Sequence, residues 1–179
     1  MAKVNQNPEQ KARDNIDAML AEAGWKVQDS KKVNFNAGPG IAVREFQTDI
    51  GPADYALFVD RKGVGIIEAK PDNWGHKITT VEEQSASYAG AQLKWVKNKE
   101  PLPLVYESTG IITRFTDGRD PKPRSREVFN FHRPETIQEW MTQGASLRSR
   151  LQKIPSLNHQ GLRDCPDHCN RKLGNILQG

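Results

Sequence analysis

Three closely spaced apolar segments constrain the fold of this chain more than any other feature of its sequence. Residues 41–47, 53–60 and 65–70 are short and rich in valine, isoleucine and aromatic residues. Such segments are typical of β-strands. An Arg-Lys-Gly stretch at residues 61–63 favours a hairpin between the last two segments. We therefore expect three consecutive strands of one central sheet.

Helical patterns surround these predicted strands. Pro8 at a first helical position, after Asn7 as a cap, and Gly24 as a stop predict an N-terminal helix. The apolar face of this helix is formed by Ala12, Ile16, Met19, Leu20 and Ala23. A second helix is predicted to begin at a capping box of Thr80 and Glu83 and to end before Pro101.

Later segments alternate between the same two patterns. We expect a loop at residues 29–40, further strands at 102–108, 111–115 and 127–131, and further helices at 136–141 and 147–153. The core order is therefore helix, strand, strand, strand, helix, strand. This order predicts an α/β domain with a central mixed sheet flanked by helices.

The length and composition suit a single folded domain without a membrane span. A chain of 179 residues with 36% hydrophobic residues can bury a core and is not depleted enough to be disordered. No apolar stretch approaches the roughly 18 residues of a membrane span. Cys165 and Cys169 are the only cysteines, which suits a reducing compartment better than a disulfide framework. We expect a cytoplasmic protein.

Positive charge is concentrated in the last third of the chain. Residues 118–179 carry 11 basic and 6 acidic side chains, whereas residues 1–117 carry 15 and 16. A basic cluster suits a polyanion such as DNA, although a solvated surface loop is the alternative. The candidate DNA-binding residues are Arg119, Lys122, Arg124 and Arg126.

The strand at residues 65–70 ends in charged residues that its apolar character does not explain. Side chains alternate across a strand, so Glu68 and Lys70 share one face, and Asp54 on the preceding strand is close enough to join them. Two adjacent carboxylates repel each other, and a divalent cation is the usual way to neutralise them. Magnesium, or manganese in its place, held by Asp54, Glu68 and the Ala69 carbonyl would support phosphodiester hydrolysis, with Lys70 at the attacking water. The alternative is an ordinary surface ion pair of Glu68 with Lys70.

A longer motif distinguishes these two interpretations. The segment AVREFQTDIGPADYALFVDRKGVGIIEAKP, at residues 42–71, closely resembles the N-terminal nuclease region of the R subunits (HsdR-type) of type I restriction enzymes. The similarity extends upstream to Arg13, Ile16 and Asp17 and downstream to an RSREVF stretch at residues 124–129. The resemblance implies a restriction-endonuclease-like core of the PD-(D/E)xK superfamily. It assigns Asp54, Glu68 and Lys70 to the catalytic positions.

The resemblance also suggests supporting residues. Gln84 and Tyr88 match a Q-x-x-x-Y motif of these subunits, and four residues apart they would share one face of a helix. They could contact DNA phosphates or orient Lys70, or they could be a half-buried tyrosine beside a solvated glutamine. Glu9 resembles an acid of the first helix that some related nucleases place near the metal.

The chain departs from the family pattern in two respects: it lacks a motor motif, and the resemblance fades after the LRDCP stretch at residues 162–166. It contains no G-x-x-x-x-G-K-[ST] loop, so ATP would act only through motor domains that this chain does not carry. We expect a nuclease domain at residues 1–155, followed at 156–179 by an extension or truncated linker. A zinc site formed by His159, Cys165, His168 and Cys169 is disfavoured, because adjacent His168 and Cys169 cannot easily bind one metal.

The resemblance implies a type I site-specific deoxyribonuclease, represented here by its nuclease domain alone. The expected partners are double-stranded DNA and the methyltransferase and specificity subunits of the restriction complex. The alternatives are an inactive DNA-binding or docking module of that complex, and a nuclease for RNA or single strands.

Overall fold

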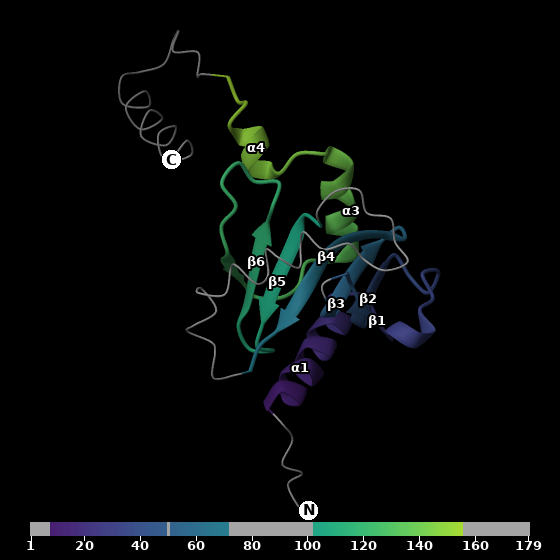
Figure 1. Ribbon diagram of the computed structural model, residues 1–179. Coiled ribbons are helices and arrows are strands. Elements are labelled where there is room, and N and C mark those ends of the chain that lie inside the picture. The colour runs from purple at the N-terminus through teal and green to yellow at the C-terminus, as the bar shows by residue number, and fades with distance from the viewer. Residues whose placement is uncertain (1–7, 50, 72–101, 156–179) are drawn as a thin grey trace, which may run out of the picture.

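The computed structural model describes residues 8–49, 51–71 and 102–155. Within these ranges seven strands form one sheet whose spatial order follows the chain: β1 (Lys26–Asp29), β2 (Gly40–Gln47), β3 (Pro52–Val59), β4 (Lys62–Ala69), β5 (Leu104–Ser108), β6 (Thr113–Asp117) and β7 (Arg126–Val128). The same ranges contain the helices α1 (Pro8–Glu22), α3 (Pro134–Gln143) and α4 (Leu147–Leu151), and a 3-10 turn at Ser30–Lys32. The predicted α/β class with a mixed sheet and flanking helices is confirmed (Figure 1).

The sheet combines parallel and antiparallel pairs. β1 with β2 and β4 with β5 are parallel, and the other neighbours are antiparallel. The predicted hairpin is formed by β3 and β4, where Val59 pairs with Lys62. Its two-residue turn is Asp60-Arg61, with φ of +48° and +63°, as a type I′ turn requires. The turn therefore begins one residue earlier than predicted.

Each face of the sheet carries its own apolar core. On one face Ile16 of α1 and Ile137 of α3 pack with Tyr55 and Ile67 of the central strands. The opposite face is formed by other side chains of the same strands, among them Val43, Phe46, Phe58, Ile66 and Val105. Figure 1 shows α1 toward one end of the sheet and α3 and α4 toward the other. Burial on both faces explains why the central strands are almost continuously apolar.

β6 begins and ends two residues later than predicted, and two other strands differ more in kind. β1 was not predicted, and the predicted loop at residues 29–40 contains the 3-10 turn. The sequence of β1 is KVQD, and its side chains are exposed or half-buried, so no apolar alternation marks it as a strand. β7 ends at Val128 rather than at residue 131. Beyond it Phe129 is fully exposed, whereas Phe131 is buried in the core.

Gly65 sets the approach of β5 to β4. A Cβ atom at this position would lie 2.3 Å from the backbone oxygen of Leu104 in β5. Any side chain would therefore push these paired strands apart. The alignment of the two strands, which carries Glu68 opposite Glu107, depends on this glycine.

The described residues include no helix long and apolar enough to cross a membrane. The helix expected from Thr80 and the extension expected at residues 156–179 lie outside the described ranges.

Candidate active site

Asp54 and Glu68 occupy neighbouring positions on two adjacent strands. Tyr55 of β3 pairs with Ile67 of β4, so Asp54 and Glu68 are the next residues outward on each strand. The backbone N–H of Ala69 donates to Asp54 Oδ2 at 2.9 Å, which ties the two strands together beyond that pair. The structure therefore brings together the two carboxylates that the sequence singles out.

Glu68 lies in an unfavourable environment for a charged carboxylate. The residue is only 7% exposed. Burial, and next the charge of Asp54, raise the pKa of Glu68 to about 7, although Lys70 opposes this shift. Within the described part of the chain, its buried Oε1 has no hydrogen-bond partner. A buried carboxylate oxygen without a hydrogen-bond donor destabilises the fold unless a ligand binds to it.

Lys70 approaches Glu68 from the same face of β4. Its Nζ lies 3.7 Å from Glu68 Oε2, and its side chain is 13% exposed. The backbone N–H of Lys70 donates to the oxygen of Ser108 at 2.8 Å, which extends the pairing of β4 with β5. Glu68 and Lys70 are thus a mostly buried pair rather than the surface ion pair of the alternative interpretation.

Arg13 of α1 is part of this site, and sequence reasoning gave it no role beyond its place in the family motif. Its Nη2 donates to Asp54 Oδ1 at 2.6 Å, and its Nη1 donates to Glu45 Oε1 at 3.2 Å. Burial disfavours the charge, but Asp54, then Glu45 and Glu9, outweigh it and raise the pKa of Arg13. Glu9 is exposed and lies one helical turn before Arg13, where its charge adds to this shift.

A second hydrogen-bonded group holds α1 against the sheet. Asp17 of α1 accepts from the Tyr55 hydroxyl at 2.8 Å and forms an ion pair with Arg44 of β2. Burial raises the pKa of Tyr55, so the hydroxyl stays protonated and can donate. These contacts fix the turn of α1 that carries Arg13 next to Asp54.

Glu107 extends the acidic row to a third strand. It pairs with Glu68 across β4 and β5, is 4% exposed, and its charge also raises the pKa of Glu68. Across residues 8–49, 51–71 and 102–155, no group of three or more His, Cys, Asp or Glu side chains is arranged to hold a metal ion. Among the described residues, Asp54 and Glu68 are the neighbouring carboxylates that would hold an ion. Hard oxygen donors and the partnerless Glu68 Oε1 fit magnesium, with backbone carbonyl or water completing the shell.

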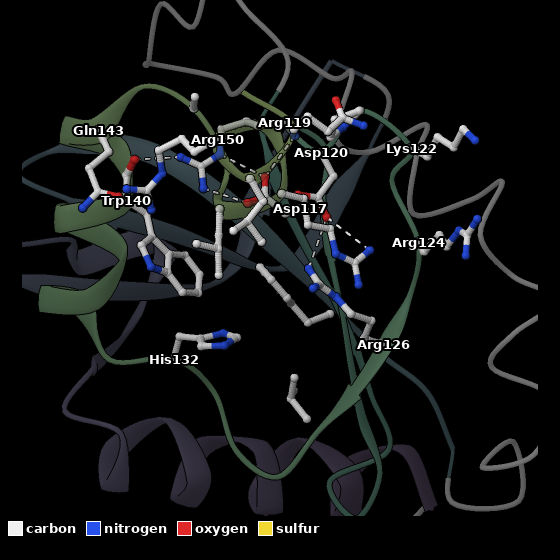
Figure 2. A pocket seen from close by; sticks show the side chains of 18 of the residues that line it. Asp117, Arg119, Asp120, Lys122, Arg124, Arg126, His132, Trp140, Gln143 and Arg150 are labelled. Carbon is white, nitrogen blue, oxygen red and sulfur yellow. Dashed lines mark hydrogen bonds and ion pairs between the residues drawn. The ribbon is translucent and has the colours of Figure 1, made fainter. Parts of the chain in front are cut away.

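The predicted DNA-binding cations fall into two groups. Arg119 is engaged inside the protein: Nε and Nη2 bind both oxygens of Asp117, and Nη1 donates to the Trp140 carbonyl at 2.8 Å. Lys122 and Arg124 are exposed and have no ion-pair partner among the described residues. Figure 2 shows both side chains pointing away from Trp140. Of the four predicted cations, two therefore lack an ion-pair partner among the described residues, and Arg126 is partly paired.

These basic residues surround a pocket that is separate from the carboxylate site. The pocket has a volume of about 570 Å³ and lies between β6, the segment leading to β7, α3 and α4. None of Asp54, Glu68 and Lys70 lines it. The charge cluster and the predicted catalytic residues thus occupy different parts of the molecule.

Several residues that the sequence analysis considered lie outside the described ranges. These are Gln84, Tyr88, His159, Cys165, His168 and Cys169. The roles expected for Gln84 and Tyr88 stay predictions, and the disfavoured zinc site is not tested.

Three comparisons agree with the resemblance that the sequence motifs carry. Residues 25–110 match a family model described as the second domain of the type I restriction enzyme EcoKI endonuclease subunit. The EcoKI endonuclease subunit of Escherichia coli strain K12 is 27% identical over 208 aligned positions, which cover 87% of this chain and 18% of that protein.

A solved structure shows the same fold. It is a fragment of a putative HsdR subunit of a type I restriction enzyme from Vibrio vulnificus YJ016, with a TM-score of 0.51 and 16% identity. The match covers 99% of this chain and 34% of that one. The chain thus spans about a fifth to a third of the length of the relatives it matches.

Proposed function

Because this chain contains a region of the HsdR-type endonuclease subunit of type I restriction enzymes, we propose that its carboxylate site hydrolyses DNA phosphodiester bonds with magnesium. The observation that carries this proposal is Glu68, buried beside Asp54 with one carboxylate oxygen lacking a partner among the described residues. A docking surface does not need a buried carboxylate whose pKa is raised in this way.

Each residue of the site has a separate role in the proposed reaction. Asp54 and Glu68 would hold the ion, and manganese could replace it. When bound, magnesium would polarise the scissile phosphate and lower the pKa of a water molecule. Lys70, 3.7 Å from Glu68, can orient that water or stabilise charge that develops on the phosphate. Arg13 holds Asp54 in place and balances its charge.

The function of the complete enzyme is a further part of the proposal. As the family resemblance implies, the nuclease would act on double-stranded DNA within a complex that includes methyltransferase and specificity subunits. ATP would act through the motor domains of that complex. Lys122 and Arg124, exposed and free of acidic partners among the described residues, are the best placed of the predicted cations to contact DNA phosphates.

Plasmid nicking by this chain is the direct test. We expect slow, sequence-independent nicking in manganese at low salt and little at physiological salt, because contacts mainly to phosphates weaken steeply with ionic strength. Duplex DNA, single-stranded DNA and RNA should be compared as substrates. The proposal fails if the chain neither binds manganese in a calorimetric titration nor nicks any of these substrates.

The Lys70→Met variant separates catalysis from metal binding. The substitution keeps the buried alkyl stem but removes the ammonium group, so we expect manganese binding to persist while nicking falls by about a hundredfold. Binding can be measured by calorimetry and nicking on plasmid DNA. Lys62→Met, at an exposed position of the same strand, is the matched control. Normal nicking by Lys70→Met would remove Lys70 from the mechanism.

A further inference from the structure

The pocket beside β6 and β7 combines positive charge with aromatic rings. Its lining includes six basic and three acidic side chains, a surplus of three positive charges. Three of the cations, Lys122, Arg124 and Arg150, have no ion-pair partner in the described part of the chain. An electrostatic surplus of this kind, concentrated in a concave surface, favours an anionic ligand.

Two of the other three cations, Arg126 and Arg148, converge on one buried carboxylate, whereas Arg119 is paired with Asp117. Arg126 Nη2 lies 3.4 Å and Arg148 Nη1 lies 3.8 Å from Asp120 Oδ2, and the Asp120 side chain is only 2% exposed. A single carboxylate cannot use the donors of two guanidinium groups, each of which has five N–H groups. Asp120 therefore orients both arginines, and their other donors stay available to a phosphate.

One wall of the pocket is aromatic. The His132 ring lies 4.8 Å from the Trp140 ring and 4.7 Å from the Phe115 ring, measured between centroids. Burial, and next the charge of Arg126, lower the pKa of His132, so this wall is neutral near pH 7. Figure 2 shows His132 and Trp140 on one side of the pocket, with Arg126 and Asp120 across from them. Aromatic rings of this kind can stack on a nucleobase.

We infer that this pocket binds a nucleotide, with its phosphate on Arg126, Arg148 and Arg150 and its base against Trp140 and His132. The volume of about 570 Å³ lies in the range of small-molecule sites. The nucleotide can be a free mononucleotide or the terminal unit of a DNA strand, since both present the same phosphate and base. The site uses no metal and shares no residue with the carboxylate site.

Calorimetric titration of the full chain in EDTA tests this inference without any contribution from cleavage. The probes are AMP, a 5′-phosphorylated single-stranded oligonucleotide and inorganic phosphate. We expect saturable nucleotide binding that is tighter than phosphate binding, because the base adds stacking to the phosphate contacts. AMP binding would identify a free nucleotide as ligand, and binding of the oligonucleotide alone would identify a strand end.

Two variants locate the binding. Arg148→Gln/Arg150→Gln, both at exposed positions of α4, should weaken nucleotide binding by about tenfold or more, since hydrogen bonds to an anion are lost. Asp120 keeps Arg126 as its partner in this variant. Trp140→Leu should reduce AMP binding to the level of phosphate. Lys31→Gln/Lys32→Gln, an equal loss of charge on the 3-10 turn, should bind normally.

Three results would overturn the inference. The first is the absence of saturable binding of AMP and of the oligonucleotide. The second is unchanged binding in Arg148→Gln/Arg150→Gln. The third is parallel loss of binding in Glu68→Gln, which would place the nucleotide at the carboxylate site. Because Glu68→Gln should eliminate nicking and leave the pocket unaffected, failure of this inference can be told from failure of the proposed nuclease function.

Discussion

Glu68→Gln and Asp54→Asn should each reduce nicking by about a thousandfold or more, since losing a cation that stabilises transition-state charge costs several kcal/mol. Both substitutions remove a negative charge without changing the shape of the side chain. In Asp54→Asn the remaining side-chain oxygen can still accept from the backbone N–H of Ala69, so the strand ends should stay tied. Manganese titration should show the same loss, because each variant removes one of the two carboxylates proposed to bind the ion.

An exposed carboxylate provides the control for this pair. Glu22→Gln, in the last turn of α1, removes the same charge far from the paired ends of β3 and β4 and should nick normally. Circular dichroism would verify that all three variants are folded. Unchanged manganese affinity in both Asp54→Asn and Glu68→Gln would show that the ion binds elsewhere, and the proposed ligands would then be wrong.

The strands that carry the site could be predicted because their sequences consist mostly of apolar residues that are buried in the fold. Residues 41–47, 53–60 and 65–70 are largely apolar, and the charged end of the third stands out against that background. Register follows once two such strands form a hairpin, which is why Asp54 and Glu68 could be placed together without a structure. β1 lacks this signal, since its four residues are mostly polar and their side chains are exposed or half-buried.

The long-range partners of the site could not be predicted. Arg13 is 41 residues from Asp54, and Glu107 is 39 residues from Glu68, so no local pattern relates either pair. The role predicted for Arg119 was also affected by contacts that the sequence does not show. Arg119 belongs to a basic stretch that suits DNA, yet it donates to Asp117 and to the Trp140 carbonyl. Charge in a sequence does not reveal which cations are already paired. The family motif supplied the candidate functional residues, whereas the structure supplied their electrostatics.

In the absence of divalent ions, Glu68→Gln should gain stability relative to the unmodified protein as pH rises. Folding raises the pKa of Glu68 from 4.5 to about 7, so the folded state keeps a proton that the unfolded state releases. The stability linked to this proton is complete below about pH 4.5 and is lost as pH rises through about 7. A shift of this size corresponds to about 3 kcal/mol. Glutamine does not titrate and avoids this loss.

Urea unfolding at pH 4 and pH 8, in EDTA, measures the difference in free energy of unfolding between the two proteins. The contributions of the other titrating groups cancel in this difference. Between pH 4 and pH 8, we expect the free energy of unfolding of Glu68→Gln to rise by about 3 kcal/mol relative to that of the unmodified protein. Manganese at pH 8 should then stabilise the unmodified protein but not the variant, because a bound cation favours the ionised carboxylate. A difference that does not change with pH would show that Glu68 ionises freely in the folded protein. The strain on this carboxylate, from which we infer the metal site, would then be absent.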